Sequence, residues 1–192
     1  MEMFKDLPVI FFENEAEWTA WLEDHFSQQS GIWVKFAKKA SGITSLSYAS
    51  AVDVALCYGW IDGQAQSLDE NYYLQRFTPR RAKSIWSKRN IEKIAALTAA
   101  GRMKASGLAQ VEAAKLDGRW EQAYDAPSAM TTPADFQALL DAHPTAKQNF
   151  ENLNHTNTYA ILWQIQTAKR PETREIRMKK LLAMLQKGDK PH

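Results

Sequence analysis

The sequence lacks the residues and motifs by which many enzymes, metalloproteins and membrane proteins are identified. Cys57 is the only cysteine in 192 residues, so a disulfide within the chain is impossible, which is typical of a reducing compartment. The four histidines stand far apart, without a cysteine or histidine partner at ligand spacing, and they predict no metal site. No apolar run approaches the ~20 residues of a membrane-spanning helix, so we expect no membrane insertion.

The short motifs of common catalytic folds are absent as well. Neither G-x-S-x-G nor the phosphate-binding patterns G-x-x-x-x-G-K and G-x-G-x-x-G occur, and no serine or threonine stands in a recognisable arrangement with a base. The segment Met1–Pro8 holds charged residues in place of the apolar core of a signal peptide, so we expect a cytoplasmic protein. These absences imply no cofactor and favour binding over catalysis, with enzyme status left open.

The composition that remains, 45% hydrophobic and 24% charged, is that of a globular chain with one large core or two small ones. Alternation and periodicity predict strands over residues 9–12, 32–36, 60–66 and 72–77, and helices over residues 14–27 and 48–58. The last two strands form a plausible hairpin, and the chain from residue 88 on is helical. We therefore predict an α+β fold. A small antiparallel sheet packed with helices occupies residues 1–124, and a mainly helical region, residues 133–192, packs on it or continues the same domain.

One segment is strongly basic. Seven basic residues lie between positions 76 and 93 against the single acid Glu92, a net charge of +6 in a chain that carries +2 overall. Phe77 and Trp86 are interleaved with these charges. Fixed positive charge beside flat apolar rings is what an anion-binding surface needs. The basic residues are Arg76, Arg80, Arg81, Lys83, Lys88, Arg89 and Lys93.

The middle of this segment is predicted to be a loop. Pro79 does not fit a central strand, so Arg80 and Arg81 are expected to project from a loop, a common place for binding residues. Ser84 or Ser87 caps the helix that follows, whose free N–H groups add positive potential beside Lys88 and Arg89. The alternative interpretation is a solvated charged face, with the two aromatic rings anchoring the loop to the core. A second basic stretch, residues 169–190, is interpreted mainly as a solvated helix surface.

The predicted hairpin holds the one candidate for acid–base chemistry. Alternation places Trp60 and Asp62 on one face of the first strand, and Tyr72 and Arg76 on one face of the second. If the two faces coincide, Asp62 lies within reach of Arg76. The pair is then either a structural ion pair or part of a polar pocket, in which Arg76 offers its guanidinium to a carboxylate or phosphate and Trp60 stacks.

Several short motifs follow one another along the chain: Cys57–Gly63, Gln75–Arg80, Ile85–Lys88, Gly101–Met103, Gly118–Trp120 and Thr167–Arg174. In this order and spacing they resemble the bacterial YdeI/OmpD-associated, or bacteriocin-protection, family, from about Ile32 to Lys187. The family is largely uncharacterised, and the resemblance implies no established catalytic residue. It does direct attention to the segments Trp60–Asp62 and Arg76–Lys88.

We expect a binding protein for an anionic, phosphate-bearing ligand. In one alternative the protein is a small-molecule enzyme with Asp62 as general base. In another, the basic strip docks an acidic protein partner. Nucleic acid is a less favoured partner, because a net charge of +2 is low for a dedicated nucleic-acid-binding protein. The expected ligand-binding residues are Trp60, Asp62, Arg76, Arg80, Arg81, Trp86, Lys88 and Arg89.

Overall fold

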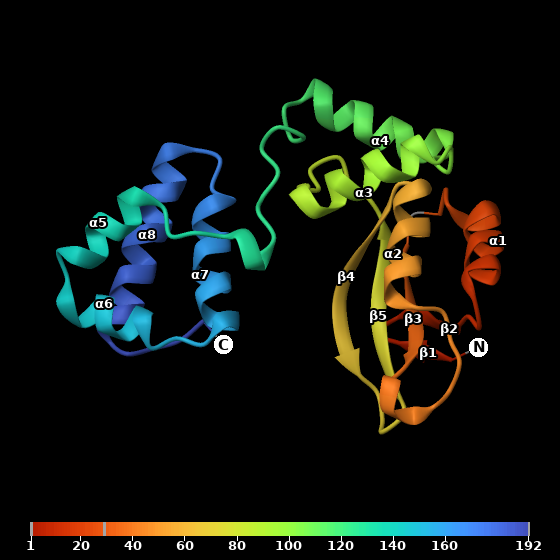
Figure 1. Cartoon of the computed structure of the whole chain (residues 1–192), viewed down its shortest axis with the longest axis horizontal. Coiled ribbons are helices and arrows are strands. Elements are labelled where there is room, and N and C mark those ends of the chain that lie inside the picture. The colour runs from red at the N-terminus through yellow and green to blue at the C-terminus, as the bar shows by residue number, and fades with distance from the viewer. Residues whose placement is uncertain (1, 29, 192) are drawn as a thin grey trace. The chain divides into compact units, whose positions relative to one another are not determined.

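The computed structural model describes residues 2–28 and 30–191. It divides the chain into two compact units, Met1–Ala123 and Tyr124–His192. The first unit holds a β-sheet with helices, and the second is helical (Figure 1). The predicted α+β class is confirmed.

The sheet has five strands in the order β1-β2-β3-β5-β4. Strands β4 and β5 form the predicted antiparallel hairpin. The sheet is mixed rather than antiparallel throughout, since β2 and β3 run parallel. The cause is helix α1 (Glu15–His25), which connects these two strands and supplies the crossover that a parallel pair needs. The strands are β1 (Met3–Phe4), β2 (Leu7–Phe11), β3 (Ile32–Ala37), β4 (Trp60–Ser67) and β5 (Tyr72–Pro79).

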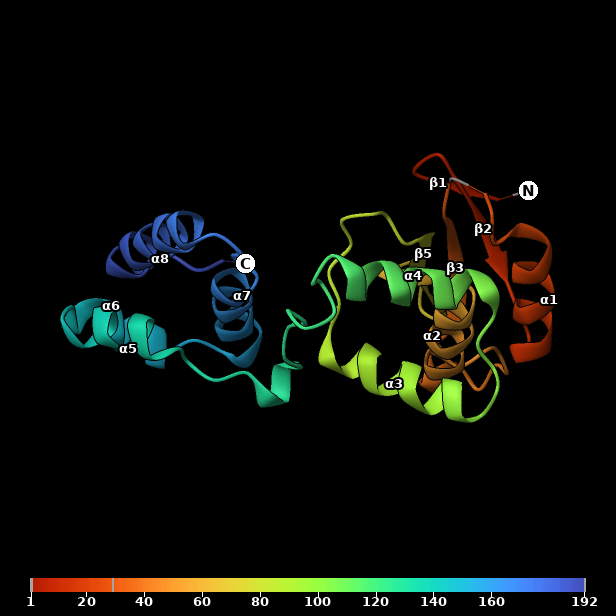
Figure 2. The same ribbon diagram turned by 90° about the horizontal axis from the view of Figure 1, so that it is seen from above.

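Helices α1 and α2 (Tyr48–Cys57) lie side by side on one face of the sheet (Figures 1 and 2). Two further helices, α3 (Lys88–Ala99) and α4 (Ala105–Leu116), complete this unit, with a short 3-10 helix at Lys39–Ser41. Of the two serines predicted as caps, Ser87 begins α3: its hydroxyl accepts a hydrogen bond from the backbone N–H of Asn90 at 3.2 Å.

The sheet is buried on both faces along β3. Ile32, Val34 and Phe36 belong to the large core shared with α1 and α2. Trp33 points to the opposite face, where it packs with Val9 and Leu74 in a smaller apolar cluster. Residues of β5 alternate in the same way, so that Phe77 faces the helices and Arg76 lies on the face away from them.

The second unit has its own apolar core. It contains a short 3-10 helix at Pro127–Ala129 and the helices α5 (Ala134–Asp141), α6 (Pro144–Glu151), α7 (His155–Gln166) and α8 (Pro171–Gln186). Helix α8 packs against α6 and α7 (Figure 1). The core residues include Phe136, Leu140, Ile161 and Leu185.

Two arginines of α8 differ from the solvated surface expected for residues 169–190. Arg174 donates a hydrogen bond to the carbonyl oxygen of Ile165 at 2.9 Å, and Arg177 donates to that of Gln164 at 2.7 Å. Arg174 also forms a double hydrogen bond with the carboxylate of Asp135, with both distances 2.8 Å. These bonds satisfy carbonyl groups at the C-terminal end of α7, which have no partner within their own helix.

Candidate functional site

Three of the predicted arginines line one hollow in the first unit, which we call the arginine hollow. Arg76 comes from β5, and Arg80 and Arg81 come from the loop that follows. The hollow has a volume of about 460 Å³. None of its described lining residues is an acid. The other lining residues are Leu7, Ser30, Gly31, Thr78, Pro79 and Ala82.

Gly31 forms the wall of the hollow where β3 begins. A Cβ atom at this position would overlap the carbonyl oxygen of Phe77 and the side chain of Thr78. Only glycine therefore lets the chain before β3 approach β5 this closely. The close approach places Ser30 and Gly31 beside the arginines.

Arg76 and Arg81 are the arginines whose placement suits contact with a ligand. Arg76 is half-buried, and its Nε atom is buried without a hydrogen-bond partner among residues 2–28 and 30–191. Such a donor costs about 1–3 kcal/mol when it stays unsatisfied. Arg81 is exposed, and its backbone N–H is held by the Ser84 hydroxyl at 3.0 Å. Arg76 thus lines the hollow as a half-buried side chain, and Arg81 offers a solvent-facing guanidinium.

Arg80 has a different role, because it is only 6% exposed. Its guanidinium carbon lies 3.5 Å from the centre of the Trp86 ring, a close cation–π contact, and its Nη1 donates to the carbonyl oxygen of Ile85 at 3.3 Å. Trp86 in turn packs edge-on against Trp120, with ring centres 5.0 Å apart. Arg80 therefore fixes the loop that carries Arg81, and adds a stationary charge to the hollow.

Arg119 supports the same loop and was not anticipated from the sequence. It is 6% exposed, and its Nε donates to both carboxylate oxygens of Asp117, at 2.8 and 2.7 Å. Its Nη1 donates to the carbonyl oxygen of Ser84 at 2.9 Å. The Gly118–Trp120 motif was the available signal. A charge count confined to residues 76–93 could not connect it with the loop.

The expectation that Trp60 and Trp86 stack on a ligand is corrected by their burial. Their side chains are 0% and 1% exposed, so neither ring offers a face to a ligand. Trp60 lies on the helix-facing side of β4, where its Nε1 donates to the carbonyl oxygen of Phe26 at 2.9 Å. Both rings are core residues that hold the basic loop and the sheet in place.

The expected proximity of Asp62 and Arg76 is corrected by the strand register. Asp62 pairs directly with Phe77, and directly opposed residues share a face, so Arg76, next to Phe77, lies on the other face. Asp62 instead accepts a hydrogen bond from the Tyr48 hydroxyl at 2.6 Å. Burial and the bond to Asp62 both raise the pKa of Tyr48 above its ordinary value. Asp62 lines neither of the cavities described here.

The remaining basic residues of the segment lie outside the hollow. Lys88 and Arg89 are exposed in the first turn of α3, and the charge of Arg89 acts on Tyr48. Lys93 forms an ion pair with Asp53 of α2. Of the basic segment, Arg76, Arg80 and Arg81 therefore line the hollow, and Lys83, Lys88, Arg89 and Lys93 do not.

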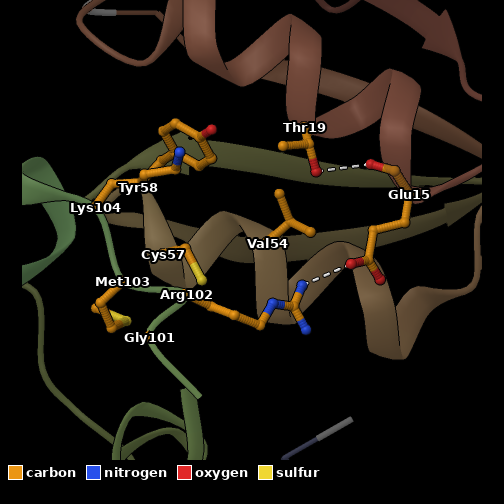
Figure 3. A pocket seen from close by; sticks show the side chains of 9 residues that line it. All are labelled: Glu15, Thr19, Val54, Cys57, Tyr58, Gly101, Arg102, Met103 and Lys104. Atoms are coloured by element: carbon orange, nitrogen blue, oxygen red, sulfur yellow. Dashed lines mark hydrogen bonds and ion pairs between the residues drawn. The ribbon is translucent and has the colours of Figure 1, made fainter. Parts of the chain in front are cut away.

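A second cavity, of about 520 Å³, lies between α1, the C-terminal end of α2 and the loop Gly101–Lys104 (Figure 3). We call it the Cys57 cavity. Burial raises the pKa of the Cys57 thiol, and the charge of Arg102 opposes this shift. The polar side chains that line the cavity are Glu15, Thr19, Arg102 and Lys104, and its more apolar lining comes from Val54, Cys57, Tyr58 and Met103.

Glycines position the loop that closes this cavity. Gly101 ends α3 with φ +67°, a conformation in which the backbone N–H of Arg102 donates to the carbonyl oxygen of Leu97 at 2.9 Å. A Cβ at Gly107 would overlap the carbonyl oxygen of Cys57, so α4 can lie against the end of α2 only because residue 107 is glycine.

In the part of the chain that the structure describes, no helix is both long enough and apolar enough to cross a membrane. Within the same residues, no group of three or more histidine, cysteine, aspartate or glutamate side chains is arranged to hold a metal ion.

Two protein-family models match parts of the chain. The model of DUF8412, described as a domain of unknown function, matches residues 10–110, more than half of the 192 residues. The chain belongs to the DUF8412 family. In this DUF8412 protein a second model, OmdA, described as "Bacteriocin-protection, YdeI or OmpD-Associated", matches residues 129–188. No curated protein and no solved structure matches the chain.

Some of the motifs that carry the family resemblance lie in one matched range, and some lie in the other. The motif Thr167–Arg174 lies within the OmdA match, and the YdeI/OmpD-associated resemblance is confirmed there. The motifs between Cys57 and Met103 lie within the DUF8412 match instead. Most residues of the arginine hollow and all residues that line the Cys57 cavity also fall in the DUF8412 range.

Proposed function

We propose that the N-terminal unit of this DUF8412 protein binds a small phosphate-bearing anion in the arginine hollow. The observation that supports this most strongly is the convergence of Arg76, Arg80 and Arg81 on one hollow whose described lining residues include no acid. Positive charge collected in a concave surface attracts and retains anions.

The three arginines contribute in different ways. Arg81 approaches the ligand from solvent and can donate two parallel hydrogen bonds to a phosphate. Arg76 lines the hollow from β5 and adds a second positive charge that attracts an anion. Arg80 is already ordered against Trp86, so its charge acts without the entropic cost of fixing a flexible side chain.

The structure favours a small ligand over a nucleic acid strand. A volume of about 460 Å³ falls in the range of small-molecule sites. Non-specific binding of single strands depends on exposed aromatic rings on which bases stack, and Trp60 and Trp86 are buried. The exposed side chains of Lys83, Lys88 and Arg89 lie outside the hollow.

Isothermal titration calorimetry with inorganic phosphate, pyrophosphate and adenine nucleotides, at low and moderate salt, tests the proposal. We expect pyrophosphate or a nucleotide to bind, and more weakly as salt rises. Arg76→Gln and Arg81→Gln should each weaken binding by roughly tenfold, because each removes hydrogen bonds from a charged donor. Lys83→Gln is the matched control, since Lys83 lies in the same exposed loop but not in the hollow.

Two results would contradict the proposal: no binding of any of these anions at low salt, or an equal loss of affinity in the Lys83→Gln control. Asp62→Asn should leave affinity unchanged, because Asp62 is on the opposite face of the sheet. A loss of binding in that variant would favour the alternative in which Asp62 acts on the ligand. Arg80 is unsuitable for this test, since its replacement disturbs the loop itself.

A further inference from the structure

Two ion pairs frame the Cys57 cavity. Arg102 Nη2 lies 2.6 Å from Glu15 Oε1, and Lys104 Nζ lies 3.4 Å from Glu23 Oε1. Glu15 and Glu23 are eight residues apart on α1, so they face the loop from the same side of the helix, about two turns from each other. Thr19 lies midway between them and also lines the cavity. The loop and α1 are thus joined at both sides of an open space.

The interior of the cavity is more apolar than this frame. Figure 3 shows Val54 and Cys57, from α2, between Thr19 on one side and Arg102 on the other. Met103 of the loop is half-buried, and its flexible thioether side chain adapts to ligands of different shape. Apolar and polar side chains both line the cavity, and small-molecule sites combine apolar contacts with a few polar groups that fix the orientation of the ligand.

Each of the two lining cations is paired with a glutamate of α1. Glu15, the partner of Arg102, itself lines the cavity, whereas Glu23, the partner of Lys104, does not. The side chains of the Arg102–Glu15 pair are 40% and 43% exposed. Ion pairs with this much exposure to solvent contribute little to stability, so an incoming anion can replace Glu15 as the partner of Arg102.

We propose that the Cys57 cavity binds a small organic molecule with an apolar body and a single anionic group, which takes the place of Glu15 on Arg102. The apolar body lies against Val54, Met103 and the Cys57 side chain. This site is separate from the arginine hollow, and neither proposal depends on the other.

The probe 8-anilinonaphthalene-1-sulfonate has this chemistry, and N-phenyl-1-naphthylamine is its uncharged counterpart. Fluorescence titration of the full chain should show saturable binding of the sulfonate at unchanged near-ultraviolet circular dichroism. The uncharged compound should bind at least tenfold more weakly. Alkylation by iodoacetamide, followed by mass spectrometry, reports on Cys57 alone because the chain has no other cysteine. Bound sulfonate should slow this alkylation severalfold.

Variants of Arg102 and Glu15 distinguish a role of this ion pair in ligand binding from a role in holding the loop. Arg102→Gln should weaken binding of the sulfonate about tenfold. Glu15→Gln should strengthen it severalfold, since it removes the internal competitor for Arg102. Lys115→Gln is the control and should change nothing: Lys115 is as exposed as Lys104 and also ion-paired, but lies outside the cavity.

The proposal is overturned if the sulfonate does not bind the native protein, or if it binds without slowing the alkylation of Cys57. Equal affinity for the sulfonate and the uncharged compound would show that the anionic group does not contribute to binding. If Glu15→Gln weakens binding as much as Arg102→Gln does, the ion pair only supports the loop. That result would contradict the proposal that the anionic group replaces Glu15 on Arg102.

Discussion

The arginine hollow and the Cys57 cavity lie in the same unit and have similar volumes, about 460 and 520 Å³, but they differ in how their charges are balanced. The described lining of the hollow includes no acid, whereas Arg102 and Lys104 at the Cys57 cavity are each paired with a glutamate of α1. Lys93 belongs to the basic segment of the sequence, yet it is paired with Asp53. Whether a cation can serve a ligand therefore depends on the acids that the fold brings to it, and not on the local charge of the sequence.

The largest expected effects come from the two glycines that shape these cavities. Gly31→Ala and Gly107→Ala each force a Cβ onto a backbone carbonyl oxygen and should lower the free energy of unfolding by about 3 kcal/mol. Urea denaturation followed by tryptophan fluorescence measures this, because six of the seven tryptophans lie in the N-terminal unit.

Gly63→Ala is the control for both glycine variants. The nearest atom to a Cβ at position 63 is 3.7 Å away, so the substitution should cost less than about 1 kcal/mol. Equal losses in the three variants would show that close packing at Gly31 and Gly107 is not what shapes the cavities. Where Gly31→Ala still folds, it should lose affinity for pyrophosphate and retain the sulfonate probe.

The next largest effect is a difference in stability between variants of two neighbouring arginines, Arg80 and Arg81. Arg80→Met removes a buried guanidinium from the Trp86 ring and should destabilise the unit by about 2 kcal/mol. Arg81→Met removes an exposed side chain and should cost less than about 0.5 kcal/mol, while weakening anion binding by roughly tenfold. The same urea titration compares them, and an equal loss of stability would contradict the division of roles.

A smaller effect is expected at Tyr48, which lines neither cavity. Tyr48→Phe removes the hydrogen bond to Asp62 and should cost about 1 kcal/mol or less, because Tyr48 is partly exposed. The folded-state pKa of Tyr48 is raised above the ordinary value of 10.0, so its stabilising contribution is present below pH 10 and is lost as the pH rises further. Absorbance titration at about 295 nm should lose its latest-titrating tyrosine in the variant; an unchanged titration would contradict this.

The smallest effect is a change in the pH dependence of Cys57 alkylation, with no loss of stability. Burial raises the pKa of this thiol, so the alkylation rate should reach half its maximum at a higher pH than in a free thiol. Arg102→Gln should move this midpoint higher still, and Glu15→Gln should move it lower, because these charges act on the thiolate in opposite directions. A midpoint that is the same in all three proteins would show that the ion pair does not act on the cavity.

Local features of the fold could be predicted from the sequence because they depend on neighbours within a few residues. The cap at Ser87 and the alternation of the β4–β5 hairpin are of this kind. The faces of Asp62 and Arg76 could not be predicted, because the register is set between strands.

In the candidate site, too, features set by nearby residues differ from features set by contacts between distant segments. Arg76, Arg80 and Arg81 all line the hollow, since they are close along the chain and flank one strand end, but the sequence left open whether they converge. It could not distinguish the exposed Arg81 from the buried Arg80, whose partner ring is six residues away in a folded loop. Arg119 approaches that loop from a distant part of the sequence, so no local pattern reveals it.

The two ends of the sheet have a consequence for how this protein behaves at high concentration. One end is β1, only two residues long, and the other is β4, whose pairing is interrupted by a bulge between Asp62 and Ala65. A long, regular edge strand exposes a row of free backbone donors and acceptors onto which another chain can add. Neither end offers such a row, since one is too short and the other changes register midway. The bulge between Asp62 and Ala65 therefore also hinders the growth of the sheet into aggregates.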